Sequence, residues 1–321
     1  MNNSLYIVVP CYNEEEVLTE TARQLKEKMD NLIITGKISE ASRVIFVNDG
    51  SKDNTWEIIS ALHDRDTLFG GINLSRNRGH QNALMSGLMT VKKHADMAIS
   101  MDADLQDDIN AVDDMVNRYL DGCDIVYGVR SKRTEDKFFK RVTAEGYYRL
   151  MQMMGVETVF NHADYRLMSK RALEGLSQFK ETNLYLRGIV PMIGYKSDYV
   201  FYERSERYAG ESKYSLMKMV SFALEGITSL SIRPIRIISC LGIAIFLMSI
   251  IMLIYTLVVY YTGHTIAGWS SLVISVWTLG GLLMLSIGVV GEYIGKIYLE
   301  TKERPRYIVE EFLNKENENE K

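Results

Sequence analysis

The sequence predicts an α/β domain with a mostly parallel sheet, followed by two transmembrane helices. Two observations lead to this architecture. Over residues 1 to about 130, short apolar runs alternate with stretches of helical periodicity, and near the C-terminus the stretches 237–261 and 267–291 contain no charged residue. The chain has 321 residues, of which 47% are hydrophobic, enough to bury an α/β core and to leave a second module.

Five short apolar runs predict the strands of the sheet. Between the first two, Leu18, Ala22 and Leu25 recur at helical spacing. Such alternation is typical of a mostly parallel sheet with helices on both faces. Ligands bind these sheets beyond the carboxyl ends of the strands, so the candidate functional residues are those that follow each run. The runs are residues 6–9, 44–47, 71–74, 97–101 and 124–127.

The charge balance and the cysteines exclude several classes of protein. With 37 basic and 41 acidic residues, the net charge is -4, which predicts no nucleic-acid partner because nucleic acids are bound by broad cationic surfaces. The three cysteines are far apart and odd in number, which argues against a disulfide framework or a clustered zinc site. We therefore expect a reducing compartment.

The two uncharged stretches are each long enough to cross a membrane. Residues 262–266 separate them, so we expect a hairpin with both ends on one side. Arg233 and Arg236 precede the first stretch, Lys296 and Lys302 follow the second, and the loop between them has no basic residue. The positive-inside rule therefore predicts a multi-pass protein of the cell membrane with both termini in the cytoplasm. The alternative, a buried hairpin in a soluble protein, requires unusually long and apolar core helices.

The chain is accordingly expected to have three parts. These are a cytoplasmic α/β domain over residues 1–232, a transmembrane hairpin over 233–298 and a cytoplasmic tail over 299–321. Within the first part, residues 137–154 and 214–232 are amphipathic and predict helices at the membrane interface, with ordinary packed helices as the alternative. Glycines in the hairpin would allow close packing against a second copy of the chain, as in a homo-oligomer.

Polar clusters follow the first two predicted strands. Tyr12 and Glu14 come after the first, and a tyrosine ring can stack on a nucleobase while a carboxylate can accept hydrogen bonds from ribose hydroxyls. Asp49 comes after the second and could bind the edge of a base. Each cluster alone is equally compatible with a polar turn, since acidic residues favour helix N-termini and Asn-Asp-Gly-Ser is ordinary turn chemistry.

Two carboxylates, Asp102 and Asp104, follow the fourth predicted strand at a spacing of two residues. This spacing suits a hard divalent cation such as Mg²⁺ or Mn²⁺ that shares its coordination shell with phosphate oxygens. The alternative is an acidic turn that caps the helix expected near Asp108.

In order and spacing, these three clusters resemble the signatures of inverting family 2 glycosyltransferases with the GT-A fold. Segments 163–167, 183–188 and 207–214 are similar to motifs of the branch that acts on polyprenyl phosphates, which includes dolichyl-phosphate mannose synthases and bacterial bactoprenol glucosyltransferases. The predicted hairpin also matches the bacterial members, so the resemblance covers nearly the whole chain. The chain departs from the pattern at two places. Related proteins often have a pair of prolines after the glutamine, where this chain continues with Asp107, and Arg78 stands where an aromatic residue is expected.

The resemblance implies a reaction and roles for individual residues. The donor would be a nucleotide sugar, with UDP-glucose or another UDP-hexose expected, and the acceptor undecaprenyl or another polyprenyl phosphate. Asp164 would lie beside the reacting sugar as the catalytic base. The residues implied to line the nucleoside pocket are Pro10, Tyr12, Glu14 and Asp49, and those implied to hold the metal and the diphosphate are Asp102, Asp104 and Gln106.

The charge of the acceptor favours a different role for Asp164. A phosphate monoester has a second pKa of about 6 and is largely dianionic at neutral pH, so it needs little help from a base. We therefore hypothesise that Asp164 orients the acceptor or the sugar hydroxyls. An anionic acceptor also needs cations, and an arginine fork suits phosphate well, although any single surface cation is often only solvated. The candidates are Arg130, Arg133, Arg187, Arg207 and Lys213.

Two other functions remain open from the sequence. A processive polysaccharide synthase would share the donor motifs but would be expected to carry a Gln-x-x-Arg-Trp element and more spans, and Trp56, Trp269 and Trp277 lie in no such setting. A catalytically silent membrane scaffold would have no need of the intact pair Asp102 and Asp104. The sugar, the lipid length and the downstream pathway leave no local trace.

Overall fold

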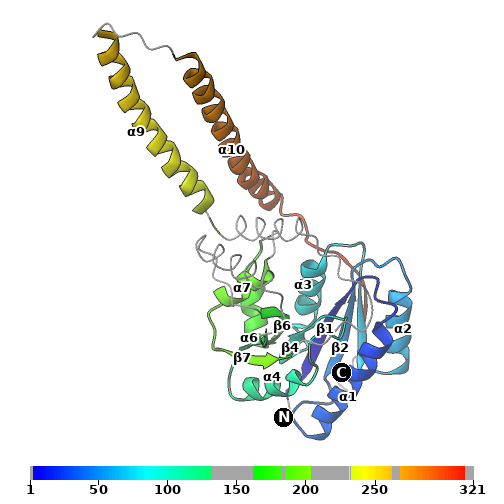
Figure 1. Ribbon diagram of the computed structural model, residues 1–321. Coiled ribbons are helices and arrows are strands. Elements are labelled where there is room, and N and C mark those ends of the chain that lie inside the picture. Colours follow the sequence, from blue (N-terminus) through cyan, green and yellow to red (C-terminus); the bar gives the residue numbers. More distant parts are fainter. Residues whose placement is uncertain are drawn as a thin grey trace. The chain divides into compact units, whose positions relative to one another are not determined.

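The computed structural model describes residues 3–131, 162–181, 185–203, 231, 233–261 and 268–314. Two compact units are present (Figure 1). The α/β unit contains the described residues up to 203 together with the C-terminal segment 304–314, and the helical unit contains those between 231 and 303.

The described part of the α/β unit contains one eight-stranded sheet with the order β7-β5-β6-β4-β1-β2-β3-β8. Strands β3, β2, β1 and β4 are neighbours in parallel, and β7 is parallel to β5. Strand β6 is antiparallel to both β4 and β5. The five predicted strands and the mostly parallel sheet are thus confirmed. The strands are β1 Leu5–Cys11, β2 Arg43–Asn48, β3 Phe69–Leu74, β4 Met97–Ser100, β5 Ile125–Arg130, β6 His162–Ser169, β7 Ser197–Tyr202 and β8 Val309–Leu313.

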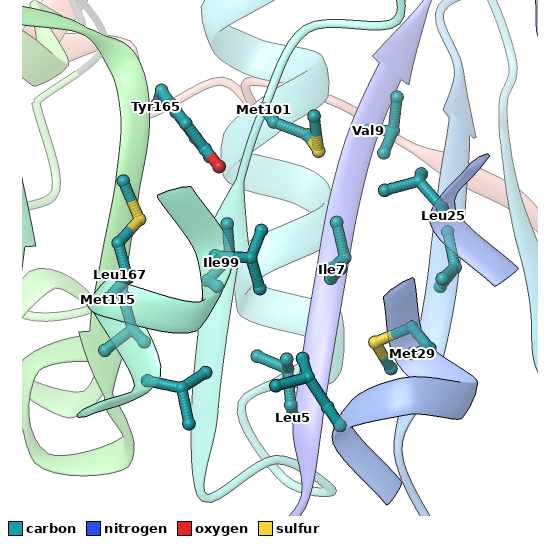
Figure 2. Packing of buried hydrophobic residues seen from close by; sticks show 14 of the residues in the cluster. Leu5, Ile7, Val9, Leu25, Met29, Ile99, Met101, Met115, Tyr165 and Leu167 are labelled. Carbon is teal, nitrogen blue, oxygen red and sulfur yellow. The ribbon is translucent and has the colours of Figure 1, made fainter. Parts of the chain in front are cut away.

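Helices cover both faces of this sheet. On one face, Leu25 and Met29 of α1 and Met115 of α4 join a buried cluster with Ile7 and Ile99 of the strands (Figure 2). Burying each such side chain contributes about 1.5–3 kcal/mol. The described helices of this unit are α1 Leu18–Ile34, α2 Thr55–Arg65, α3 His80–Val91, α4 Ala111–Leu120, α6 Lys170–Leu176 and α7 Leu186–Met192.

Helix α3 packs on the opposite face, over β1 and β2. A glycine makes this close approach possible, because a Cβ atom added to Gly87 would lie 2.3 Å from Cγ1 of Val8 and 2.8 Å from Cγ2 of Val47. The α3 backbone therefore lies directly against the two strands whose carboxyl ends carry the first polar clusters. The start of α3, at His80, is fixed at the same edge of the sheet.

Strand β8 is a feature that the sequence analysis did not predict, since it assigned residues 299–321 to a tail. The strand pairs antiparallel with β3, with Phe312 opposite Ile72. Just before it, the carbonyl of Ile308 accepts a hydrogen bond of 3.1 Å from the backbone N–H of Ser75. The C-terminal segment thus covers the open edge of β3 and contacts the loop that follows this strand.

The helical unit contains α9, Arg233–Tyr261, and α10, Trp269–Thr301. Both lie where the two uncharged stretches predicted helices, and α10 continues ten residues beyond the expected end at Gly291. Within the described residues, one segment, Thr278–Thr301, meets the length and apolarity of a membrane span, with a mean hydropathy of 1.5. One candidate span is therefore present, and the two-span hairpin stays a prediction.

Candidate active site

The carboxyl ends of β1, β2 and β4 meet at one edge of the sheet, and the neighbouring start of β6 brings Asp164 to the same edge. Because β6 is antiparallel to β4, with Arg166 opposite Ser100, Asp164 comes beside the position of Asp102. The Ser100 hydroxyl donates a hydrogen bond of 2.5 Å to the backbone carbonyl of Asp164. The chain order also reverses between β1 and β4, which is where sheets of this kind bind ligands.

The loops after β1 and β2 hold each other by hydrogen bonds. The backbone N–H of Asn13 donates to Oγ of Ser51 at 3.0 Å, and that of Glu14 donates to Oγ1 of Thr55 at 3.0 Å. In return, Oδ1 of Asn13 accepts from the backbone N–H of Lys52 at 2.8 Å, with Asn13 in the left-handed region at φ 54°. The first two predicted clusters therefore form one structural element.

Two candidate nucleoside contacts have contrasting exposure. The Tyr12 side chain is 44% exposed, so its ring is available for stacking. Pro10 is buried as part of β1, opposite Val47. A proline is tolerated in this central strand because the pairing of β1 with β4 ends at Val8, so no ladder hydrogen bond to β4 is needed at residue 10.

Asp49 connects β2 to the turn after β3. Its carboxylate is 2% exposed and accepts hydrogen bonds from the backbone N–H groups of Arg78, at 2.6 Å, and Gly79, at 2.9 Å. Burial raises the pKa of Asp49, while these two hydrogen bonds oppose the rise. The contact uses the backbone of residue 78, so the presence of arginine in place of an aromatic residue leaves it intact.

The residue after Asp49 must be glycine for two reasons. Gly50 has φ 63°, in the left-handed region, and a Cβ atom there would lie 2.5 Å from the backbone nitrogen of Asn77. The turn after β2 and the turn after β3 therefore touch backbone to backbone. The Asn-Asp-Gly-Ser cluster acts here as turn chemistry that shapes this edge of the sheet.

The acidic pair after β4 lies in a sharply turned loop. Leu105 has φ 55°, which is rare for a bulky residue, and the backbone N–H of Gln106 donates to Oδ1 of Asp104 at 3.2 Å. Burial and the surrounding carboxylates raise the pKa of Asp102 to about 6. His80, at the start of α3, places Nε2 3.6 Å from Oδ1 of Asp102 and 3.7 Å from Oδ2 of Asp164.

The donor set of this loop fits a divalent cation bound jointly with a ligand. Within the part of the chain that the structure describes, no three His, Cys, Asp or Glu side chains form a complete metal site. Mg²⁺ and similar ions are commonly held by one or two carboxylates plus substrate phosphates. Asp102 and Asp104 supply such a pair. Because both are acidic, they would repel the phosphates of a ligand unless a cation lay between them.

Asp164 is surrounded by cations. The guanidinium Nη2 of Arg166, whose side chain is 1% exposed, lies 2.6 Å from Oδ1 of Asp164, and Nη2 of Arg187 lies 3.2 Å from Oδ2. Burial alone would raise the pKa of Asp164, but Arg187, Arg166 and His80 hold it well below its usual range. Asp164 is therefore an ionised carboxylate at neutral pH and a weak proton acceptor.

Arg130, one of the candidate phosphate ligands, has protein partners. Its Nε donates to the Tyr202 hydroxyl at 3.2 Å, and its Nη2 lies 3.5 Å from Oδ1 of Asp107. The same Tyr202 hydroxyl donates to Oδ1 of Asp107 at 2.5 Å. These three side chains link β5 and β7 to the loop that follows the acidic pair. Asp107, in this loop, is one of the positions where the chain departs from the family pattern.

The structure brings three of the sequence-predicted residues together: Asp102 and Asp164 both lie beside His80, and Arg187 contacts Asp164. Arg133, Arg207, Lys213 and the segments 137–154 and 214–230 lie outside the described residues.

Three residues around this site were not selected from the sequence: His80, Arg166 and Gln81, whose Oε1 accepts a hydrogen bond of 3.0 Å from the backbone N–H of Leu186. The rule that functional residues follow strands points to the loop after β3, and His80 comes directly after that loop. Arg166 lies inside a motif quoted for Asp164, but its burial against this carboxylate is visible only once β6 is paired with β4.

Comparisons with known proteins show the family of the chain. Residues 6–177 match the family model described as glycosyl transferase family 2. The chain is 53% identical over 306 residues to YkoT of Bacillus subtilis, an uncharacterized glycosyltransferase, covering 95% of this chain and 91% of the relative. It is 38% identical over 313 residues to a prophage bactoprenol glucosyl transferase homolog of Escherichia coli, covering 94% and 97%. It is 39% identical over 313 residues to the bactoprenol glucosyl transferase of Shigella phage SfV, again covering 94% and 97%.

The family match spans the first six strands, β1 to β6, and with them every loop from Tyr12 to Asp164 that forms the site. The relatives match over nearly their whole length as well as that of this chain, so the likeness extends into the two C-terminal helices. The chain is a member of glycosyl transferase family 2.

Proposed function

We propose that this glycosyltransferase moves one monosaccharide from a nucleotide-diphosphate sugar to a polyprenyl phosphate, with inversion at the anomeric carbon. UDP-glucose or another UDP-hexose is the proposed donor, and undecaprenyl phosphate the proposed acceptor. The observation that carries the proposal is the position of Asp164 between Arg166 and Arg187, beside the carboxylate of Asp102. The bactoprenol glucosyl transferases to which the chain is similar support the choice of lipid.

The charges of the site suit a reaction between two anions. In the transfer, an oxygen of the lipid phosphate attacks the anomeric carbon, and the bond from this carbon to the diphosphate breaks with the electron pair leaving on the nucleotide. A divalent cation held by Asp102 and Asp104, with Gln106 nearby, would neutralise the diphosphate charge. Arg187 is 44% exposed at its side chain and is the described cation best placed to bind the acceptor phosphate.

Asp164 has an orienting role in this proposal. A lipid phosphate is already largely dianionic at neutral pH, since its second pKa is about 6, so no strong base is required. The cations around Asp164 lower its pKa and make it a poor base, but they fix its two oxygens as acceptors for hydroxyl groups of the sugar. Pro10, Tyr12, Glu14 and Asp49 line the nucleoside side of the same pocket in this proposal.

The two C-terminal helices are proposed to anchor the enzyme. Helix α10 contains the candidate span Thr278–Thr301, and α9 has 29 residues, also enough to cross a hydrocarbon core. Two spans would leave the α/β unit and both termini on the cytoplasmic side, where nucleotide sugars are made available to a lipid in the same membrane.

The reaction can be tested directly with purified enzyme. It is incubated with undecaprenyl phosphate, Mg²⁺ or Mn²⁺ and radiolabelled UDP- and GDP-sugars, with Asp104→Asn as the paired control. We expect one sugar to become soluble in organic solvent in a metal-dependent way, and Asp104→Asn to abolish this product. A polymeric product would point to a processive synthase instead, and the absence of turnover with every donor would overturn the proposal.

A further inference from the structure

The backbone of one buried residue, Leu186, joins the three elements that carry His80, Asp164 and Arg187. Leu186, the first residue of α7, donates its backbone N–H to Oε1 of Gln81 at 3.0 Å. Its carbonyl accepts a hydrogen bond of 3.3 Å from Nη1 of Arg166. Leu186 as a whole residue is 1% exposed, so neither backbone group can rely on bulk water. The Leu186 backbone is therefore held at both its N–H and its C=O by side chains.

Each of these side chains lies next to a residue of the proposed transfer site. Gln81 follows His80 in the first turn of α3, and Arg166 lies two residues after Asp164 on β6, which places both side chains on the same face of the strand. Arg187 follows Leu186 directly. Any shift of the Leu186 backbone would therefore move the start of the Arg187 side chain relative to Asp164.

We propose that Gln81 and Arg166 are positioning residues that set Arg187 against Asp164 for binding of the acceptor phosphate. This inference rests on the function proposed above for the same site. Arg187 is long and 44% exposed, and its Nη2 reaches Asp164 at 3.2 Å from the short helix α7. A flexible side chain of this kind keeps its place only if its backbone is fixed, and here the fixing atoms belong to Gln81 and Arg166.

Gln81 offers the cleaner test, because Arg166 also binds Asp164 directly. In Gln81→Leu the acceptor for the Leu186 N–H is lost while the side-chain size is nearly kept. A misplacement of about 1 Å can cost on the order of 100-fold in rate. We expect Gln81→Leu to lower kcat/KM for the lipid phosphate by about 10- to 100-fold, with the affinity for UDP within about twofold of the wild type, because the Asp49 side of the pocket is untouched.

The matched control is Gln24→Leu. Gln24 lies on α1 and donates to Glu20, so the same substitution removes a hydrogen bond outside the proposed site. This control should keep the wild-type kcat/KM. Hydrogen exchange provides a readout that is independent of the reaction: the Leu186 amide should exchange faster in Gln81→Leu than in the wild type, with the amides of β1 unchanged.

A double-mutant cycle with Arg187→Met decides whether Gln81 acts through Arg187. If it does, Gln81→Leu should have no further effect on kcat/KM in the Arg187→Met background. Independent, multiplying losses would overturn the inference, as would an unchanged kcat/KM in Gln81→Leu or a loss shared equally by UDP binding. If the wild-type enzyme glycosylates no lipid phosphate, the proposed function fails, and the exchange of the Leu186 amide still reports on the positioning.

Discussion

Two carboxylates at the same edge of the sheet, one buried and one partly buried, are held in opposite ways. On the nucleoside side, Asp49 accepts hydrogen bonds from the backbone of Arg78 and Gly79, and burial raises its pKa. On the transfer side, Asp164 is held by the guanidinium groups of Arg166 and Arg187, and its pKa is lowered. Backbone hydrogen bonds thus hold the carboxylate on the nucleoside side, and charged side chains hold the carboxylate on the transfer side.

This difference suits the two proposed substrates. A nucleoside is recognised by shape and by neutral hydrogen bonds, so its pocket needs loops held in fixed positions. A phosphate acceptor is recognised by charge, so its site needs cations whose positions are fixed by a carboxylate. Substitutions on the two sides should therefore fail in different ways.

The largest effect is expected from Asp164→Asn, which removes the charge from the centre of the transfer side. We expect transfer to the lipid to fall by about 100- to 1,000-fold, as for the loss of one preorganised electrostatic contact. Because the pKa of Asp164 lies well below neutral, the loss should be uniform between about pH 5 and pH 9 in a pH-rate profile. If the substitution instead removes one limb of the profile, Asp164 is a general base and the orienting role is wrong.

The next largest effect should come from Gly50→Ala, on the nucleoside side. Alanine costs about 1–2 kcal/mol in the left-handed region, and its Cβ would overlap the backbone of Asn77, which adds about 1–3 kcal/mol. Chemical denaturation should show a loss of about 3 kcal/mol, and calorimetry should show weaker UDP binding.

Gly122→Ala is the control for this prediction. Gly122 also has a positive φ, 85°, but its nearest neighbour would be the Lys196 Nζ at 3.8 Å. A loss in Gly122→Ala as large as that in Gly50→Ala would show that the turn-to-turn contact is unimportant.

The sequence predicted one side of this comparison better than the other. Tyr12, Asp49 and Asp102 could be selected because each lies just after a strand of a parallel sheet, and such positions can be read from a run of apolar residues. The transfer side depends on the antiparallel pairing of β6 with β4, which no local pattern specifies. Its key contacts, from His80, Gln81 and Arg166, are long-range and appear only after the chain has folded.

Strand β8 was missed for a related reason. Its five residues include two adjacent glutamates and do not alternate, and its partner β3 lies far away in the chain. The two helices predicted as spans lie between these strands in sequence, so nothing local suggested that the chain would rejoin the sheet. Long-range pairing of this kind depends on the edge that β3 leaves open.

Removal of β8 tests how far the nucleoside side depends on that edge. Deleting residues 308–321 removes the pairing with β3 and the hydrogen bond from Ser75, which begins the turn bound by Asp49. We expect a loss of about 2 kcal/mol in unfolding free energy, from a few hydrogen bonds of about 0.5–1.5 kcal/mol each. UDP affinity should fall several-fold. Deletion of residues 315–321 alone is the control and should leave both quantities unchanged.

The smallest expected effect is on folding stability at low pH. Lowering the pH should change the stability contributions of Asp49 and Asp164 in opposite directions. The pKa of Asp49 lies above its ordinary value of 3.8, so the folded state binds its proton first. As the pH falls from neutral toward the raised pKa, the wild type should therefore gain stability relative to Asp49→Asn.

The pKa of Asp164 is lowered, so its contribution is fully present above the ordinary carboxyl pKa of 3.8 and is lost as the pH falls through the lower value in the folded state. Relative to Asp164→Asn, the wild type should keep a constant stability down to about pH 4 and lose stability below it. Urea titrations at several pH values would measure both differences. Parallel behaviour of the two variants would contradict this contrast, in which burial outweighs the hydrogen bonds at Asp49 while Arg187, Arg166 and His80 outweigh burial at Asp164.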